Sequence, residues 1–211
     1  DGDGYYNEWV EDYQRRSWNA PIEINSHIGT ITTSPYSIVW NTEWVPDQSS
    51  GTISLNARIK NNQGYWYVTD VVSNLSLIRS GYSVQLYKAQ NVPERFWVRN
   101  GQSNSSVVNI PTLVDATEAK VHIRTWNGNE NNASFYTRVN STDLPSYGKD
   151  HFFSYDIVDI PLNSLSNGNN TITFQSSTAD HGIEVLWPGP AIMVKYGSIN
   201  TGLNPVITLQ P

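Results

Sequence analysis

The sequence lacks cysteine entirely and contains one methionine in 211 residues. Disulfide bonds and cysteine nucleophiles are therefore excluded. Charged residues are also scarce, at 15%, and the formal net charge of −6 argues against a general binder of nucleic acids or of anionic membranes. No apolar run approaches the length of a membrane span, and no signal peptide is present. Because the chain begins abruptly at Asp1, we expect a fragment of a larger protein.

Aromatic residues are abundant instead, with 8 Trp and 12 Tyr beside many Asn, Ser and Thr. This composition is typical of β-structure. Short apolar or alternating runs separated by turns rich in Gly, Asn and Pro indicate many short strands. In the second part of the chain the expected strands cover 83–88, 107–110, 120–126, 134–140, 152–160 and 171–175. We therefore predict an all-β protein built from β-sandwiches.

The most apolar segment, 181–196, has a Trp-Pro-Gly-Pro corner between two short hydrophobic runs. Pro188 and Pro190 cannot donate hydrogen bonds to a neighbouring strand, so they mark a break. We predict a closing hairpin or a bent strand for this segment.

The acidic segment 1–20 begins with DGDG, which alternates carboxylates with Gly as an EF-hand-type calcium loop does. The twelfth position of such a loop would be Val10, where a bidentate Glu is needed, so a plain acidic turn is the alternative. A short helix is expected over 6–16. The candidate calcium ligands are Asp1, Asp3, Tyr5 and Asn7.

Residues 27–48, HIGTITTSPYSIVWNTEWVPDQ, lead into the strand–turn–strand sequence GTISLNARIKNNQGYWYVTDVV. This stretch resembles bacterial immunoglobulin-like domains that are attached to secreted enzymes. The resemblance implies an immunoglobulin-like β-sandwich over 21–82. Independently of it, the alternation of apolar and polar residues over 52–59 and the turn at 61–64 predict a hairpin over 52–72. Such domains normally begin with two further strands, whereas this chain offers only the acidic segment there.

A second resemblance lies in LNSLSNGNNTITF, residues 162–174. It is similar to the strand entry of jelly-roll carbohydrate-binding modules and of accessory domains of glycoside hydrolases. The resemblance implies a jelly-roll-like sandwich over 83–197, with the boundary near residue 82. The tail 198–211 has the polar composition of a linker.

Sequence motifs for catalysis are missing. No HExxH and no Gly-x-Ser-x-Gly occurs, and the four His residues are scattered along the chain. Two enzymatic alternatives stay open: a carboxylate pair drawn from distant strands for glycoside hydrolysis, and a β-sandwich lyase with a Tyr or His base. Without a site-specific motif, we expect a non-catalytic chain.

Strand alternation carries the best functional signal. Within 121–126 and 135–140, apolar positions alternate with polar and aromatic ones. If the two strands pair, one face gathers six side chains that suit a glycan, because flat rings take the C–H face of a sugar and polar groups bind its hydroxyls. The six are His122, Arg124, Trp126, Tyr136, Arg138 and Asn140. The alternative is that Trp126 and Tyr136 are a packing pair covered by a loop.

Two loops provide further candidates, because loops at the end of a sandwich often carry binding residues. They contribute Lys149, His151 and His181.

These patterns predict a non-catalytic polysaccharide-binding module of a secreted, multidomain, bacterial carbohydrate-active enzyme. The ligand expected from the two Arg is an acidic or sulfated polysaccharide. We expect a monomer with an attached catalytic domain, structural calcium, and no nucleic-acid or membrane partner. The alternatives are a structural spacer without a ligand and a β-sandwich enzyme that cleaves glycans.

Overall fold

The computed structural model describes the chain over 8–9, 14–17, 20–23, 27–129, 135–179, 181–186 and 189–197. The chain forms two compact units that divide between Gly81 and Tyr82. Regular structure in the described residues is β-strand, apart from one short 3-10 helix at Leu162–Ser164. The prediction of an all-β protein is confirmed. No helix within the described ranges is long and apolar enough to cross a membrane.

The first unit begins with a small antiparallel sheet in place of the expected helix. Its strands are β1 (Glu8–Trp9), β2 (Gln14–Ser17) and β3 (Ala20–Glu23). The helix predicted over 6–16 is therefore wrong, because both described parts of that range are strands paired with each other. The four candidate calcium ligands, Asp1, Asp3, Tyr5 and Asn7, lie outside the described residues.

The hairpin predicted over 52–72 is present. Strand β4 (Ile53–Leu55) pairs with β7 (Val72–Leu75), and β5 (Arg58–Lys60) pairs with β6 (Trp66–Val68). The Asn61 side chain shapes the turn by accepting hydrogen bonds from the backbone N–H groups of Gln63 and Tyr65, both at 3.0 Å.

A sandwich core is not visible in the described part of this unit, where Thr42 and Ile53 are the buried residues. The side chains of β6 are exposed, including Trp66 and Val68. The immunoglobulin-like assignment of this unit stays a prediction.

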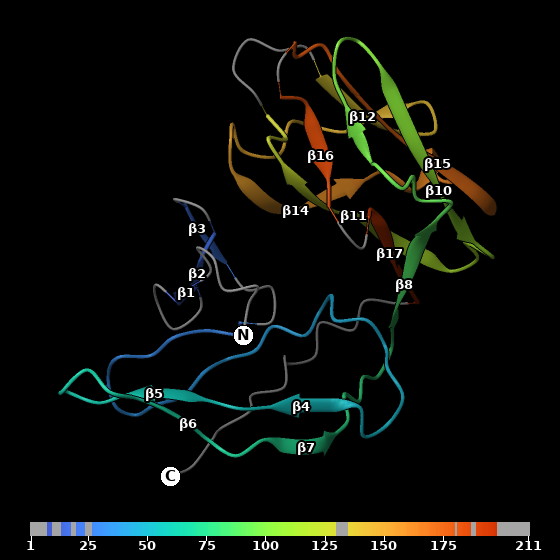
Figure 1. Ribbon diagram of the computed structural model, residues 1–211. Helices are drawn as coiled ribbons and strands as arrows, with labels where there is room; N and C mark the ends of the chain where they lie inside the picture. Colours follow the sequence, from blue (N-terminus) through green and yellow to red (C-terminus); the bar gives the residue numbers. More distant parts are fainter. Residues whose placement is uncertain are drawn as a thin grey trace. The chain divides into compact units, whose positions relative to one another are not determined.

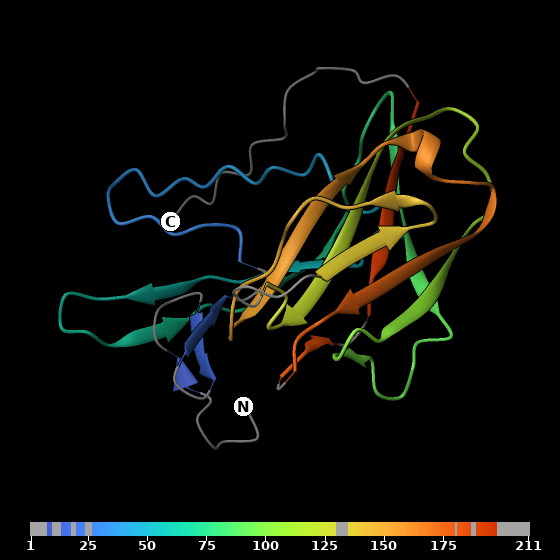
Figure 2. The same ribbon diagram turned by 90° about the horizontal axis from the view of Figure 1, so that it is seen from above.

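The second unit is a two-layered antiparallel β-sandwich (Figures 1 and 2). Its strands are β8 (Ser83–Gln90), β9 (Trp97–Val98), β10 (Ser103–Ile110), β11 (Ala116–Trp126), β12 (Phe135–Val139), β13 (Thr142–Asp143), β14 (Phe153–Ile160), β15 (Gly168–Ser176), β16 (Ile183–Val185) and β17 (Ala191–Tyr196). One layer, the β15 sheet, has the order β13-β12-β15-β10. The other, the β11 sheet, contains β14, β11, β17 and β8, with β16 and β9 completing it.

The hydrophobic core lies between these two sheets. The β11 sheet contributes Val121 and Ile123, and the β15 sheet contributes Ile172 and Phe174, each with 0% exposure. The Phe96 ring, just before β9, packs edge-on against Phe174 at 5.1 Å between centroids. Burial of a continuous apolar layer from both sheets is the main force that holds this unit together.

Strand β8 joins the two layers. It pairs with β17 through Ser83–Lys88 and with β10 through Ala89 and Gln90. Strand β8 is therefore shared between the two sheets.

The described parts of the apolar segment 181–196 hold two strands in succession. Strands β16 and β17 both pair with the same side of β11, at Thr125–Trp126 and at Ala116–His122. They therefore do not pair with each other, so the predicted hairpin is wrong and the pairing agrees with the predicted bent strand.

Candidate functional site

Strand β11 positions the first group of candidate residues. Val121, Ile123 and Thr125 face the core with 0% exposure. The alternate residues His122 and Arg124, like Trp126, are half-buried on the outer face of the β11 sheet. This alternation was predicted, and it follows from the two-residue period of a strand.

The six-residue face predicted from β11 and β12 is not formed. Strand β12 pairs with β15 and β13, whereas β11 pairs with β14, β16 and β17. The physical reason is that the chain crosses from one sheet to the other after Trp126, as sandwich topologies require, and does not turn back as a hairpin. His122, Arg124 and Trp126 therefore lie on the opposite outer face from Tyr136 and Arg138.

The β12 candidates are held by their own neighbours. Arg138 donates a hydrogen bond from Nε to Asp143 at 2.7 Å and stacks over the Tyr136 ring at 4.6 Å. This hydrogen bond lowers the pKa of Asp143 below its usual range. Asn140 adopts a positive φ of 53° and donates to Ser164 O and Asn170 Oδ1 at 2.8 and 2.9 Å. The Asn140 side-chain amide is therefore occupied in holding this turn against residues 164–170.

His122 is locked in place by its cross-strand neighbourhood. Its Nδ1 is hydrogen-bonded to the hydroxyl of Tyr155 on β14, and the two rings lie 5.6 Å apart. Burial, together with a smaller effect of the nearby Lys120 ammonium, lowers the pKa of His122 to about 4. His122 is therefore neutral at physiological pH and adds no positive charge to this face.

Trp126 and the loop candidates come together at the end of β11. The Trp126 ring meets the His151 and His181 rings edge-on, with centroids at 6.1 and 5.6 Å. The two imidazoles lie 4.7 Å apart. We call Trp126, Asp150, His151 and His181 the Trp126 cluster. Lys149 is exposed on the same loop, next to Asp150.

A chain of hydrogen bonds fixes the two imidazoles of the Trp126 cluster. His151 Nδ1 donates to the Asp150 carboxylate at 2.5 Å, and His151 Nε2 lies 3.2 Å from His181 Nδ1. Because a carboxylate oxygen accepts, the Nδ1–H group of His151 is the donor in the first contact. The second contact joins two ring nitrogens, either of which can carry the proton. The chain of contacts ends at the His181 ring.

Trp97 and Phe153 at this surface were not among the candidates taken from the sequence. In register across the sheet, Trp126 is flanked by Phe153 of β14 and Glu184 of β16, and Glu184 is flanked by Trp97 of β9. Trp97 is 36% exposed and donates from Nε1 to the His181 carbonyl at 2.7 Å. Nothing in the sequence around Trp97 places it beside Trp126.

Asn127 holds the two histidine-bearing loops together. It is fully buried at a positive φ of 54°. Its Oδ1 accepts from the His151 backbone N–H at 2.9 Å, and its Nδ2 donates to Gly182 O at 3.3 Å. Asn127 therefore positions both His151 and His181.

Two glycine contacts tighten this framework. A Cβ on Gly148 would lie 2.7 Å from Gly128 backbone atoms, so these two loops pack backbone to backbone. A Cβ on Gly182 would lie 2.5 Å from the Val98 carbonyl oxygen. Glycine is required at both positions because any side chain would push the loops apart.

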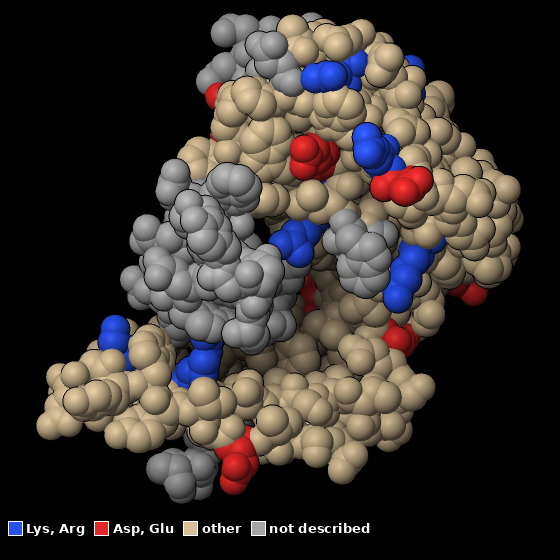
Figure 3. All heavy atoms as spheres, viewed as in Figure 1, with Lys and Arg blue, Asp and Glu red and all other residues tan. Residues whose placement is uncertain are grey.

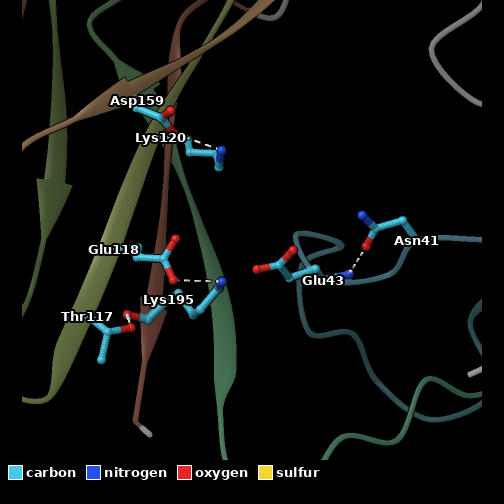
Figure 4. Close-up of polar contacts among 7 residues, drawn as sticks. All are labelled: Asn41, Glu43, Thr117, Glu118, Lys120, Asp159 and Lys195. Carbon is cyan, nitrogen blue, oxygen red and sulfur yellow. Dashed lines mark hydrogen bonds and ion pairs between the residues drawn. The ribbon is translucent and has the colours of Figure 1, made fainter. Parts of the chain in front are cut away.

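In Figure 3, Lys and Arg are mixed with Asp and Glu on the face shown and do not form a patch of one sign. Figure 4 shows two cross-strand ion pairs of the β11 sheet: Lys120 with Asp159 at 2.8 Å, and Lys195 with Glu118 at 2.9 Å. Neither pair includes a residue of the Trp126 cluster.

The groups gathered at this surface are of several chemical kinds. Across the described ranges of the chain, no group of three or more His, Asp or Glu is placed to hold a metal ion. The surface offers Trp rings, imidazoles held by hydrogen bonds and an exposed carboxylate at Glu184. These groups can stack on an apolar ring face and exchange hydrogen bonds with hydroxyls.

Comparisons with known proteins give distant matches. No family model and no curated protein matches the chain. Among solved structures, it is similar to a β-porphyranase of glycoside hydrolase family 86 from the human gut bacterium Bacteroides plebeius, with a TM-score of 0.41 and 16% identity over 71% of this chain and 30% of that chain. It is also similar to BuGH86 in complex with neoagarooctaose, with a TM-score of 0.43 and 17% identity over 73% of this chain and 30% of that chain. The chain thus spans about 30% of the length of these enzymes.

Proposed function

We propose that the second unit is a non-catalytic polysaccharide-binding module and that its binding surface is the Trp126 cluster with Trp97 and Glu184. The observation that carries the proposal is the edge-on contact of Trp126 with His151 and His181, at 5.6–6.1 Å. It gathers aromatic and polar groups from three separate segments on one outer face. Loops at the end of a rigid sandwich are a common place for such sites.

The physical basis is the match between this surface and a sugar. A pyranose has an apolar C–H face, which a Trp ring covers, and hydroxyls at its rim, which need hydrogen-bond partners. His181 and Glu184 offer such partners beside Trp126, and Asn127 and Gly182 fix the loop that carries His181. A preformed surface loses little conformational entropy when it binds.

The sequence predicted one binding face from β11 and β12, whereas the structure places these strands on opposite outer faces. Mutation of one residue on each face shows which of the two binds the polysaccharide. Trp126→Ala removes the stacking surface of the Trp126 cluster, and we expect it to weaken polysaccharide binding at least tenfold. Tyr136→Ala, on the opposite outer face, is the matched control and should bind like the wild type. Affinity electrophoresis in gels that contain single polysaccharides measures both.

Trp126→Phe keeps an aromatic ring and serves as the folding control, and thermal unfolding of each variant confirms that it is folded. Unchanged binding by folded Trp126→Ala, or loss of binding by Tyr136→Ala, would contradict the proposal. Failure of the wild type to bind any polysaccharide would favour a structural spacer without a ligand.

One observation favours a second candidate function, a glycan-cleaving enzyme. The hydrogen-bonded chain of Asp150, His151 and His181 resembles a base oriented by a carboxylate. Assay of reducing ends and of unsaturated products during the binding experiment tests it. Product release that His151→Asn abolishes would establish catalysis, and its absence with intact binding would support the binding module.

The proposal also covers the oligomeric state, the parent protein and a bound ion. We propose that the chain acts as a monomer in a secreted bacterial protein, beside an attached catalytic domain that it keeps close to its substrate. We also propose structural calcium at Asp1, Asp3, Tyr5 and Asn7. Calorimetric titration of the chelator-treated chain with calcium tests the ion, with Asp3→Asn as the variant that should lose it.

A further inference from the structure

We propose that the ligand of this surface is an acidic polysaccharide and that Arg124 binds its carboxylate or sulfate group. The proposal rests on the polysaccharide-binding function above and names both the ligand class and the residue that selects it. Carboxylate and sulfate oxygens share the chemistry that a guanidinium recognises.

Arg124 differs from three other cations of the second unit. Lys120, Lys195 and Arg138 each form an ion pair with a carboxylate, at 2.7–2.9 Å. The side chain of Arg124 makes no hydrogen bond or ion pair with any residue that the structure describes, and only its backbone carbonyl accepts a bond, from the Leu186 N–H at 2.8 Å. Its five N–H donors are therefore available to a ligand.

The position of Arg124 is suited to a ligand that is already bound at Trp126. Both side chains lie on the outer face of β11, two residues apart, which is about 6.6 Å along a strand. A sugar stacked on Trp126 therefore brings its own substituent, or that of the next sugar, within reach of the guanidinium. Arg124 also pairs in register with Tyr155, which is 43% exposed and extends the surface beyond Trp126.

The charges around Arg124 make it the anion-selecting group. On one side, His122 is hydrogen-bonded to Tyr155 and held neutral, and Lys120 beyond it is paired with Asp159. On the other side, Glu184 lies in register with Trp126. An acidic sugar would therefore orient with its anionic group towards Arg124 and its hydroxyls towards Glu184.

The experiment uses the whole chain and three classes of soluble polymer. Laminarin and xylan are the neutral probes, alginate and polygalacturonate carry carboxylates, and dextran sulfate and carrageenan carry sulfates. We expect Arg124→Gln to weaken binding of an acidic polymer about tenfold or more, because the lost contact is a charged hydrogen bond. Raising the salt concentration should weaken wild-type binding and have less effect on Arg124→Gln.

Two further variants sharpen the result. Arg138→Gln removes an equal charge from the opposite face and should leave binding unchanged. Arg124→Lys keeps the charge but loses the planar fork, so it should restore part of the affinity. Thermal unfolding verifies that each variant is folded.

The outcomes separate this inference from the proposed function. If Trp126→Ala abolishes binding while Arg124→Gln and salt change it less than twofold, the acidic ligand is wrong and the binding module stands. Preference of the wild type for the neutral polymers would have the same meaning. If Trp126→Ala leaves binding intact, both proposals fall. Comparison of the carboxylated with the sulfated polymers identifies the anionic group.

Discussion

His122 and Trp126 lie on the same face of β11, four residues apart, but their environments give them different roles. His122 is hydrogen-bonded to Tyr155 and neutral, so it supports the face. Trp126 contacts two imidazoles from loops and is part of the proposed binding surface. From the sequence both were predicted to bind a ligand for the same reason, which was their place on the outer face of one strand. The sequence did not distinguish their roles.

The neutral state of His122 makes stability depend on pH. Its pKa is about 4 in the folded chain and about 6.5 when unfolded, so the unfolded state binds the extra proton between these values. Stability is therefore unaffected by His122 above about pH 6.5 and falls as the pH is lowered towards 4, by at most about 3 kcal/mol. Urea unfolding measured every half pH unit should show this slope in the wild type.

His122→Gln is the control for that slope, because glutamine does not titrate. We expect the stability of the variant to fall less than that of the wild type between pH 6.5 and 4, while the acidic residues contribute equally to both. Parallel profiles for the two proteins would show that His122 takes up its proton without cost in the folded state.

At the scale of elements, alternation within a strand was predictable and the pairing of strands was not. Val121, Ile123 and Thr125 were assigned to the core from β11 alone, and all three are buried. The pairing of β11 with β12 that the sequence suggested is wrong. Pairing depends on where the chain goes after Asn127, and the residues themselves carry no signal of a crossover between sheets. The Trp126 cluster could not be predicted for the same reason, because its members come from three separate segments.

The loop that carries His181 depends on one glycine. Gly182→Ala places a Cβ 2.5 Å from Val98 O at a φ of +89°. We expect a loss of about 1–2 kcal/mol in stability from the backbone conformation alone, a further loss from the contact, and weakened polysaccharide binding as His181 moves. Gly101→Ala is the matched control, since its φ is +73° with nothing within 4 Å. Equal effects of the two substitutions on binding would show that the position of His181 is irrelevant.

At the scale of the whole molecule, the two units differ in how their apolar residues are used. The core cluster runs from Phe96 to Val194 and lies wholly within the second unit. In the first unit, Tyr65, Trp66 and Tyr67 are 64%, 43% and 57% exposed. The sequence predicted strands in both units, but it could not show that the described strands of the first enclose no core, because burial depends on which sheets face each other.

This difference predicts that the second unit folds alone. A chain comprising Tyr82–Ile199 should unfold cooperatively, with a melting temperature within about 5 °C of the same transition in the full chain, because it keeps every residue of the core cluster. Circular dichroism and calorimetry measure it. A fragment without a cooperative transition would mean that the second unit draws its stability from outside its own core.

The pairing of β8 with β17 determines how the second unit would respond to tension. Ser83 pairs with Tyr196, so the first and last strands of the unit are antiparallel neighbours and both ends of its chain leave from one edge. A pull between these ends would act on the hydrogen bonds of the two strands in succession, starting from Ser83 and Tyr196, and would not load them together in shear. The strand pair would open like a zipper at low force, and β8, the strand that connects the two sheets, would be the first to detach.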